Sequence, residues 1–326
     1  MHIASIGIDL GKTTFHLVAL GERSRVLFRK KFSRTQLLAY TANLRPSLIT
    51  LEVCSGAHFL GAALREQGHE ERLIPAQFVK PYRKSNKNDF LDVEAIAEAV
   101  TKQNMRSVPI KRQEQLDVQA LQRVRDRLMQ RRTALINEIR GFLLERGITF
   151  PAQPIHLRKN LPAVVEDAEQ NLTPRLQGLL DRLWQEWKQT EIDIQTITDE
   201  IERVSNEDER CQRLRQIPGF GSLVSTALVA AIGNGERFAV GAISRPGLGS
   251  CLDSTPQEAS KKLFGMSKRG NIYLRRLLIH GARAVLFRIK HDTAGLGQWV
   301  HRLSQRAPRN KFPKSLSPSE TLNTVL

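Results

Sequence analysis

Five short apolar segments near the amino terminus restrict the possible fold more than any other feature of the sequence. Each is rich in Ile, Val, Leu and Phe and is bounded by turn-forming or charged residues, a pattern typical of β-strands. The segments span residues 3–9, 15–20, 26–32, 47–53 and 71–76. The first three follow one another directly, whereas helical stretches separate the later ones. This order predicts an α/β domain in which helices cover a mixed five-stranded sheet.

Three helices are expected among these strands. Ser33 and Gln36 form a capping-box pattern that opens the first helix, and Pro46 is expected to close it. The second helix follows Ser55, a candidate N-cap, and the third spans residues 89–103.

Beyond residue 111 the apolar pattern changes to that of long helices. Apolar residues recur near heptad spacing over 112–146 and again over 176–204, with a proline-bearing connection between them. Two such helices predict a long antiparallel coiled coil. A helical-bundle core would show the same apolar stripe and remains an alternative.

The sequence IPGFG at 217–221 ends one helix, and a new helix starts at once. Gly219 and Gly221 permit a tight turn whose backbone N–H groups can hold a phosphate, as in helix–hairpin–helix elements that bind DNA. A plain turn between two helices is the alternative. Further on, residues 267–286 predict a basic helix, and the Pro- and Ser-rich end is expected to be disordered.

The charge of the chain predicts a polyanionic partner. Fifty Lys and Arg against 33 Asp and Glu give a net charge of +17. Residues 101–140 contain ten basic side chains and four acids, and residues 261–290 contain nine basic side chains and no acid. Two basic surfaces suit a protein that grips a long nucleic acid in more than one place. A basic protein without such a partner is the alternative.

Neither a membrane nor an oxidising compartment is indicated. No run of 18 uncharged apolar residues occurs, so no membrane partner is expected. Cys54, Cys211 and Cys251 lie far apart without a CxxC motif, which predicts free thiols in the cytoplasm.

Four acids occupy positions where they could act together. Asp9 ends the first strand and Glu52 ends the fourth, while Asp89 and Asp92 share one face of a helix. Neighbouring strand ends and a helix packed over the sheet would bring all four to one edge. Such a carboxylate set predicts Mg²⁺ or Mn²⁺, and two ions about 4 Å apart are the usual device for phosphodiester chemistry. Turn, capping or surface roles are the alternatives for each acid taken alone.

The histidines show no metal-ligand spacing, so packing or surface roles are expected for His16, His58, His69, His156, His280, His291 and His301.

Five stretches in order resemble the DEDD transposases of the "IS one-ten" insertion-sequence family. They are GIDLGKTTFHL, LEVCSGAHFLGAAL, KSNKNDFLDVEAIAEAV, LRQIPGFGSLVSTALVAAIG and GMSKRGNIYLRRLLIHGARAV, and the similarity covers residues 3–235 and 262–305. The resemblance implies a RuvC/RNase H-like catalytic domain over 1–106, a coiled-coil arm over 107–207, a mainly α-helical transposase domain with a helix–hairpin–helix over 208–307, and a tail over 308–326.

The same resemblance carries the DEDD quartet onto Asp9, Glu52, Asp89 and Asp92, with Mg²⁺ (or Mn²⁺) as cofactor. It implies element and target DNA as partners, a structured guide RNA made by the element, a homo-oligomer (dimer or tetramer), and a cytoplasmic, nucleoid-associated protein of bacteria. The residues expected to contact DNA are Gly219, Gly221, Lys268, Arg269, Asn271, Arg275 and Arg276.

The sequence departs from the family pattern where the family has a nucleophilic serine in a glycine-rich loop. That position falls near Pro256, and Ser254 is the candidate nucleophile. Codons for residues 242–252 can be chosen so that a frame displaced by one base gives the family text. We therefore hypothesise compensating frameshifts over 239–260, a further one in the tail, and a decayed copy.

The expected function is a DNA transposase that cleaves and exchanges strands with metal assistance. A RuvC-like metal-dependent junction nuclease and a non-catalytic nucleic-acid-binding protein are the alternatives.

Overall fold

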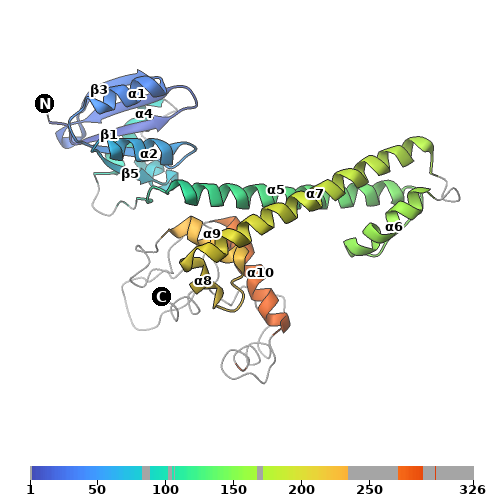
Figure 1. Ribbon diagram of the computed structural model, residues 1–326. Helices are drawn as coiled ribbons and strands as arrows, with labels where there is room; N and C mark the ends of the chain where they lie inside the picture. The colour runs from blue at the N-terminus through green and yellow to red at the C-terminus, as the bar shows by residue number, and fades with distance from the viewer. Residues whose placement is uncertain are drawn as a thin grey trace. The chain divides into compact units, whose positions relative to one another are not determined.

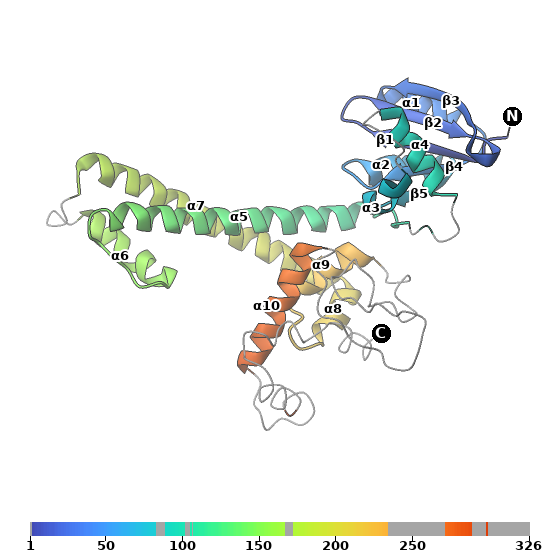
Figure 2. The same cartoon turned by 180° about the vertical axis from the view of Figure 1, so that it is seen from behind.

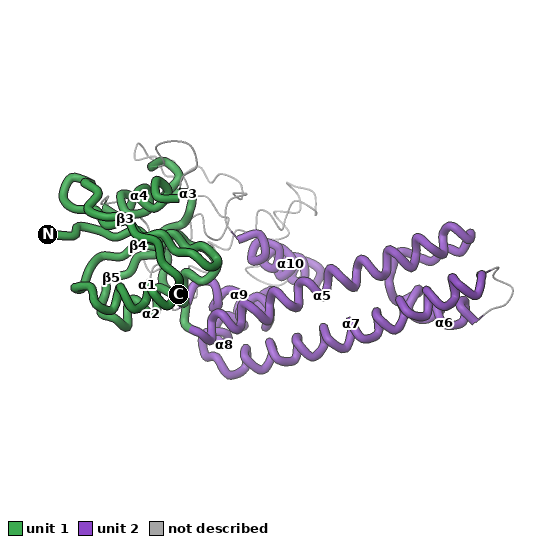
Figure 3. The backbone as a smooth tube through the Cα atoms, turned by 90° about the horizontal axis from the view of Figure 1, so that it is seen from above, with its two compact units in different colours: residues 1–112 green, residues 113–326 purple. Residues whose placement is uncertain are grey.

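The computed structural model describes residues 2–82, 89–101, 105, 107–166, 172–233, 271–288 and 298. The chain divides into two compact units, residues 1–112 and residues 113–326 (Figure 3).

A mixed five-stranded sheet forms the centre of unit 1, as the apolar segments predict. Its strands are β1 (Ser5–Leu10), β2 (Phe15–Leu20), β3 (Val26–Phe32), β4 (Leu48–Glu52) and β5 (Glu70–Ile74). The spatial order is β3-β2-β1-β4-β5. The first three strands pair antiparallel, whereas β4 runs parallel to both β1 and β5. The carboxyl ends of β1 and β4 therefore meet at one edge of the sheet.

Among the residues described in unit 1, the helices beside the sheet are α1 (Arg34–Ala42), α2 (Ala57–Glu66), α3 (Ala76–Val79) and α4 (Asp89–Ala99), with short 3₁₀ turns at Glu22–Ser24 and Lys80–Tyr82. The predicted capping box of Ser33 and Gln36 is present in both directions. Helix α1 ends at Ala42, four residues before Pro46, and Asn43 forms its C-cap. The N-cap of α2 is Gly56, with φ of 89°, rather than the expected Ser55, because the turn after β4 needs a left-handed residue there.

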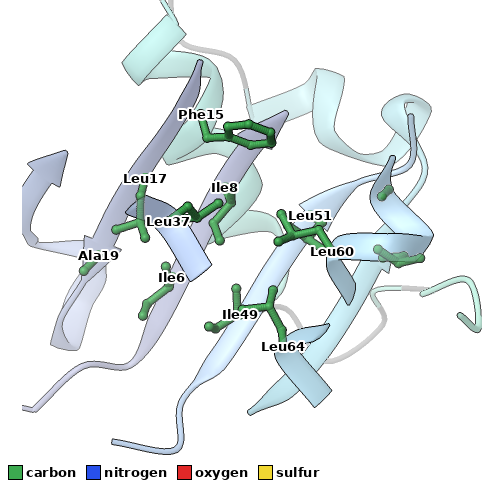
Figure 4. Packing of buried hydrophobic residues seen from close by; sticks show 12 residues of the cluster. Ile6, Ile8, Phe15, Leu17, Ala19, Leu37, Ile49, Leu51, Leu60 and Leu64 are labelled. Atoms are coloured by element: carbon green, nitrogen blue, oxygen red, sulfur yellow. The ribbon is translucent and has the colours of Figure 1, made fainter. Parts of the chain in front are cut away.

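Alternating side chains divide the sheet into two buried faces. On one face Ile6, Ile8, Leu17, Ile49 and Leu51 pack with the buried leucines of α1 and α2 (Figure 4). The opposite face is covered by α4 (Figure 2).

Helix α4 approaches β1 unusually closely. A Cβ atom at Gly7 would lie 2.5 Å from the Val93 carbonyl oxygen and 2.8 Å from the Ala97 nitrogen. The Ser5 hydroxyl donates a hydrogen bond of 2.8 Å to the Ala97 carbonyl. Helix α4 thus rests directly on the backbone of β1, because Gly7 at the point of contact has no side chain.

Two long helices dominate unit 2 and lie side by side (Figure 1): α5 (Gln113–Leu144) and α7 (Pro174–Glu207). Arg131 Nε lies 2.8 Å from Glu186 Oε1, and Arg125 Nε donates to Thr198 Oγ1 at 2.9 Å. Since partners farther along α5 lie earlier on α7, the two helices run antiparallel.

The connection between these helices contains a helix that the sequence did not predict, α6 (Pro154–Glu166). Its first residue is a proline, which suits the start of a helix, and Pro162 lies within it. Burial of Leu157 and Leu161 against the α5–α7 cluster stabilises it despite Pro162.

Further helices in the described part of unit 2 are α8 (Glu209–Arg215), α9 (Ser222–Ile232) and α10 (Ile272–Arg288). The expected basic helix therefore begins at Ile272, and residues 267–270 lie outside the described part. None of the described helices combines the length and the apolar character that a bilayer crossing requires.

Replacing Gly7 by Ala should destabilise unit 1 by about 2 kcal/mol or more, because the new methyl group would force the α4 backbone away from β1. Urea unfolding combined with hydrogen exchange of the β1 amides measures the loss. Gly141→Ala in α5 is the matched control, since no heavy atom lies within 4 Å of the added Cβ. Equal stability of the two variants would show that α4 does not depend on this contact.

Candidate functional site

Asp9 and Glu52 lie next to each other at the carboxyl edge of the sheet. Ile8 pairs with Leu51 in the parallel β1–β4 ladder, and each acid is the next residue on its strand. Ile8 and Leu51 point into the core beneath α1 and α2. Because successive side chains alternate, Asp9 and Glu52 point to the opposite face, which α4 covers.

The first turn of α4 carries the other two acids of the predicted quartet, Asp89 and Asp92. Burial raises the pKa of Asp9 above its ordinary value, His16 lowers it, and the carboxylates of Asp89 and Asp92 raise it again. The helix thus brings two negative charges within electrostatic reach of the strand carboxylate. The close contact at Gly7 is what sets this approach.

Cys54 connects Glu52 to the same neighbourhood. Loss of water raises the pKa of its thiol, and Asp9 and then Glu52 raise it further. All four predicted acids therefore lie around one edge of unit 1, although they come from two strands and a helix.

The four carboxylates do not form a ready-made metal centre. Across the described ranges, no three His, Cys, Asp or Glu side chains lie close enough together to hold one metal ion. The donor set is nevertheless all oxygen, as Mg²⁺ and Mn²⁺ prefer, and the raised pKa of Asp9 marks a place where negative charge is unfavourable. The residues fit a hard divalent cation in their chemistry, and the side chains would have to move closer together to hold it.

His16 belongs to this site, although its sequence spacing predicted only a packing or surface role. It is the cross-strand partner of Asp9, and its Nε2 lies 3.8 Å from Asp89 Oδ2. Its ring stands edge-on to Phe90 at 5.0 Å and is 12% exposed, whereas Asp89 is 63% exposed. The sequence feature that could have identified His16 is the short turn after Leu10. This turn fixes the register of the β1–β2 hairpin and so places His16 opposite Asp9.

The other histidines with described partners have structural roles. His69 Nδ1 accepts from the Ser47 N–H at 3.2 Å, and its Nε2 lies 3.0 Å from the Thr41 carbonyl oxygen. His58 Nδ1 accepts from the Lys111 N–H at 3.3 Å.

The predicted break between two helices at 217–221 is present in unit 2. Gly219 has φ of 89°, and Gly221 is the N-cap of α9. The turn packs against α10, since a Cβ at Gly281 would lie 2.2 Å from the Gly219 carbonyl oxygen. The turn and the basic helix therefore form one backbone-to-backbone unit.

The residues of α10 expected to contact DNA also hold the helix in place. Asn271 Oδ1 caps it by accepting from the N–H groups of Tyr273 and Leu274, at 3.0 and 3.2 Å. Arg276 pairs with Asp126 of α5, and Arg275 begins the helical hydrogen bonding by donating its N–H to the Asn271 carbonyl. Ser254, Lys268 and Arg269 lie outside the described residues.

Buried polar contacts fix α10 further. The Tyr273 hydroxyl donates to Gln122 Oε1 at 2.5 Å, and Gln122 Nε2 donates to Thr226 Oγ1 at 2.8 Å. Gln122 is 3% exposed. This chain of hydrogen bonds joins α5, α9 and α10.

The chain is similar to known transposases over nearly its whole length. It is 38% identical to the transposase for insertion sequence element IS1328 of Yersinia enterocolitica, over 92% of this chain and 89% of that one. It is also 38% identical to the transposase for IS1111A of Coxiella burnetii, over 95% and 85%. Identity to a probable family 20 transposase of Pseudomonas aeruginosa is 37%, over 97% and 94%.

Two family models match the chain as well. One, described as a transposase, matches residues 6–147, and the mixed sheet inside this range fits an RNase H-like domain of the DEDD type. The other is described as the transposase IS116/IS110/IS902 family and matches residues 211–296. The chain therefore belongs to the IS116/IS110/IS902 family of insertion-sequence transposases.

Proposed function

We propose that this transposase cuts and joins DNA strands at the carboxyl edge of the unit 1 sheet, with Asp9, Glu52, Asp89 and Asp92 holding divalent cations. The observation that carries the proposal is the placement of Asp9 and Glu52 at adjacent strand ends beside the first turn of α4, and the raised pKa of Asp9 agrees with it. Carboxylates that disfavour one another's charge in a partly buried place are suited to a cation. Mg²⁺ is the expected ion, with Mn²⁺ as a substitute.

Bound divalent ions would polarise the phosphate and steady the attacking and leaving oxygens of the displacement. The protein's own contribution is to position the carboxylates. Asp9 pairs with His16 on β2 and directly follows Ile8, which pairs with Leu51 on β4, while the first turn of α4 carries Asp89 and Asp92. Cation binding has to draw at least three of the four side chains together. The exposed Asp89 can contribute to this by changing its rotamer.

The nucleophile is proposed to be Ser254, by the family resemblance. A serine hydroxyl that attacks a phosphodiester needs its proton removed and its developing charge stabilised. The competing proposal, supported by the unusual sequence over 239–260, is that frameshifts altered this loop and that this copy no longer cleaves DNA despite an intact quartet. Sequencing the gene again and comparing its reading frame tests that idea.

The other proposals rest on unit 2 and on the family. We propose that α8, the turn and α9 act as a helix–hairpin–helix on the DNA backbone, and that α5 and α7 act as a coiled-coil arm within domains bounded at about residues 106, 207 and 307. A structured guide RNA, assembly into dimers or tetramers, and a nucleoid-associated location in the cytoplasm remain predictions of the resemblance.

Cleavage assays separate the transposase from its two alternatives. With Mg²⁺ and DNA carrying an element end, the unmutated chain should cleave, and Asp9→Ala should abolish cleavage because a metal ligand is lost. Ser254→Ala should abolish it as well if the serine attacks. Cleavage that survives Ser254→Ala but not Asp9→Ala would indicate a RuvC-like junction nuclease, tested on four-way junctions. Binding without cleavage by the unmutated chain would indicate a binding protein or a decayed copy.

Asp9→Asn should raise the melting temperature of the metal-free protein at neutral pH. Because burial raises the pKa of Asp9 in the fold, the protonated acid is favoured there, and its stabilising contribution is full below 3.8 and lost as the pH rises through the folded pKa. Ionised Asp9 therefore destabilises the fold at neutral pH. The difference between variant and parent should shrink as the pH falls towards 3.8.

Thermal melting with EDTA measures the stability of the metal-free proteins. A second measurement with Mg²⁺ or Mn²⁺ then tests the effect of the cation. The cation should stabilise the parent more than Asp9→Asn, since the variant has lost a ligand. Glu202→Gln on α7 is the control for removal of a surface carboxylate. An Asp9→Asn protein that is less stable without metal would contradict the electrostatic reading of the site.

Gly221→Asp tests the hairpin without disturbing the fold. Gly221 has φ of −79°, and no heavy atom lies within 4 Å of an added Cβ. Aspartate is also a favourable N-cap, so folding should be unaffected or slightly stabilised. DNA affinity should fall several-fold, because the carboxylate occupies the place of a phosphate at the start of α9. Gly221→Asn is the neutral control in fluorescence anisotropy, and equal affinities would remove the hairpin from the DNA interface.

A further inference from the structure

A row of four side chains crosses the carboxyl edge of the unit 1 sheet. Glu52 follows Leu51 of β4, and Asp9 follows Ile8, the partner of Leu51 on β1. Asp9 pairs with His16 on β2, and His16 pairs with Lys31 on β3. The row therefore passes from two carboxylates through an imidazole to an ammonium group at the outer strand.

Lys31 points to the same face of the sheet as the acids. Its neighbours on β3 establish this independently of the pairing. Two residues earlier, Arg29 Nε donates to Glu94 Oε1 of α4 at 2.9 Å. Lys30, the intervening residue, points the other way, with its Nζ 4.2 Å from the centre of the Tyr40 ring on α1. Since strand side chains alternate, Lys31 shares the α4 face with Arg29.

The three basic side chains of this strand differ in what they do. Arg29 is paired with Glu94, and Lys30 lies over aromatic rings. Lys31 is exposed, and within the described part of the chain its side chain forms no ion pair, side-chain hydrogen bond or ring contact. His16, which separates it from Asp9, is largely buried, contacts the Phe90 ring edge-on and lies beside Asp89. Lys31 is thus the cation of the row that an approaching ligand can reach.

We propose that Lys31 binds a backbone phosphate of the DNA strand that is cleaved, next to the phosphate held at the acidic end of the row. This inference rests on the proposed function of the quartet and assigns the path of the substrate: the strand crosses the sheet edge from β4 towards β3. Lys31 is a positioning residue, because it holds a neighbouring phosphate and does not touch the reacting atoms.

The spacing of the sheet fits such a contact. Neighbouring strands lie about 4.8 Å apart, so two strand steps place Lys31 about 10 Å from Asp9. A DNA strand advances about 3.4 Å along the helix axis per nucleotide. Allowing for the length of the lysine side chain, the contacted phosphate lies within about three nucleotides of the cleaved one.

The test compares Lys31→Gln with Lys30→Gln in the full chain. The two changes remove the same charge from adjacent residues on opposite faces of one strand. Binding to a labelled duplex that carries the element end is measured by fluorescence anisotropy without divalent ions, between about 50 and 200 mM salt. Lys31→Gln should bind several-fold more weakly, and its plot of log affinity against log salt should be shallower by about 0.9. Lys30→Gln should match the parent in both respects.

Single methylphosphonate substitutions near the cleavage site then locate the contact. At one flanking position the neutral linkage should weaken binding of the parent and of Lys30→Gln, but not weaken Lys31→Gln any further. Equal losses for all three proteins at every position, or equal effects of the two lysine changes, would overturn the inference.

Cleavage of the same duplex by the parent with Mg²⁺ is measured in parallel and reports on the proposed function separately. If the parent cleaves and the two lysine variants bind alike, the inference fails while the proposed function stands. The proposed function fails if the parent does not cleave with any divalent ion and if Asp9→Asn leaves the stabilisation by metal unchanged. The strand path assigned here then fails with it.

Discussion

The approach of α4 to the backbone of β1 is the contact on which the candidate site depends. Gly7 allows the helix to lie against the strand with almost no space between the two backbones, and the Ser5 hydrogen bond to Ala97 fixes the same crossing. Two residues beyond Gly7, and one before the end of β1, the strand carries Asp9, and the first turn of the helix carries Asp89 and Asp92. A helix held farther from the sheet by an ordinary side chain would leave these carboxylates apart.

That contact has an electrostatic cost, because it brings carboxylates of like charge close together. Burial raises the pKa of Asp9, the charges of Asp89 and Asp92 raise it further, and among the described side chains His16 opposes this shift. Packing brings like charges together here, where a surface would let them separate. A divalent cation would stabilise such an arrangement, and the exposed side chain of Asp89 has room to move towards it.

Unit 2 uses a related device for another purpose. Gly219 and Gly281 let the turn before α9 and the basic helix α10 meet through their backbones, and the Gln122 contacts join both to α5. The side chain of Asn271 is consumed in capping α10. The DNA affinity proposed for this surface would therefore depend on how the helices hold the basic side chains, as well as on their number.

Residue patterns along the chain were sufficient to predict the strands, the mixed sheet, the two long helices and the family. These follow from apolar periodicity, capping and turn residues, and motif order, all of which are local along the chain. The sequence also identified Asp9, Glu52, Asp89 and Asp92 as candidates, since each lies at the end of an element.

The tertiary structure decided what local patterns cannot encode. Helix α6 forms because Leu157 and Leu161 are buried against distant helices, which outweighs Pro162. His16 and Lys31 join the acidic edge only through strand register, because pairing places residues from three strands in one row. Spacing along one strand says which face a side chain occupies, whereas the neighbours it meets on that face are set by the pairing of the whole sheet.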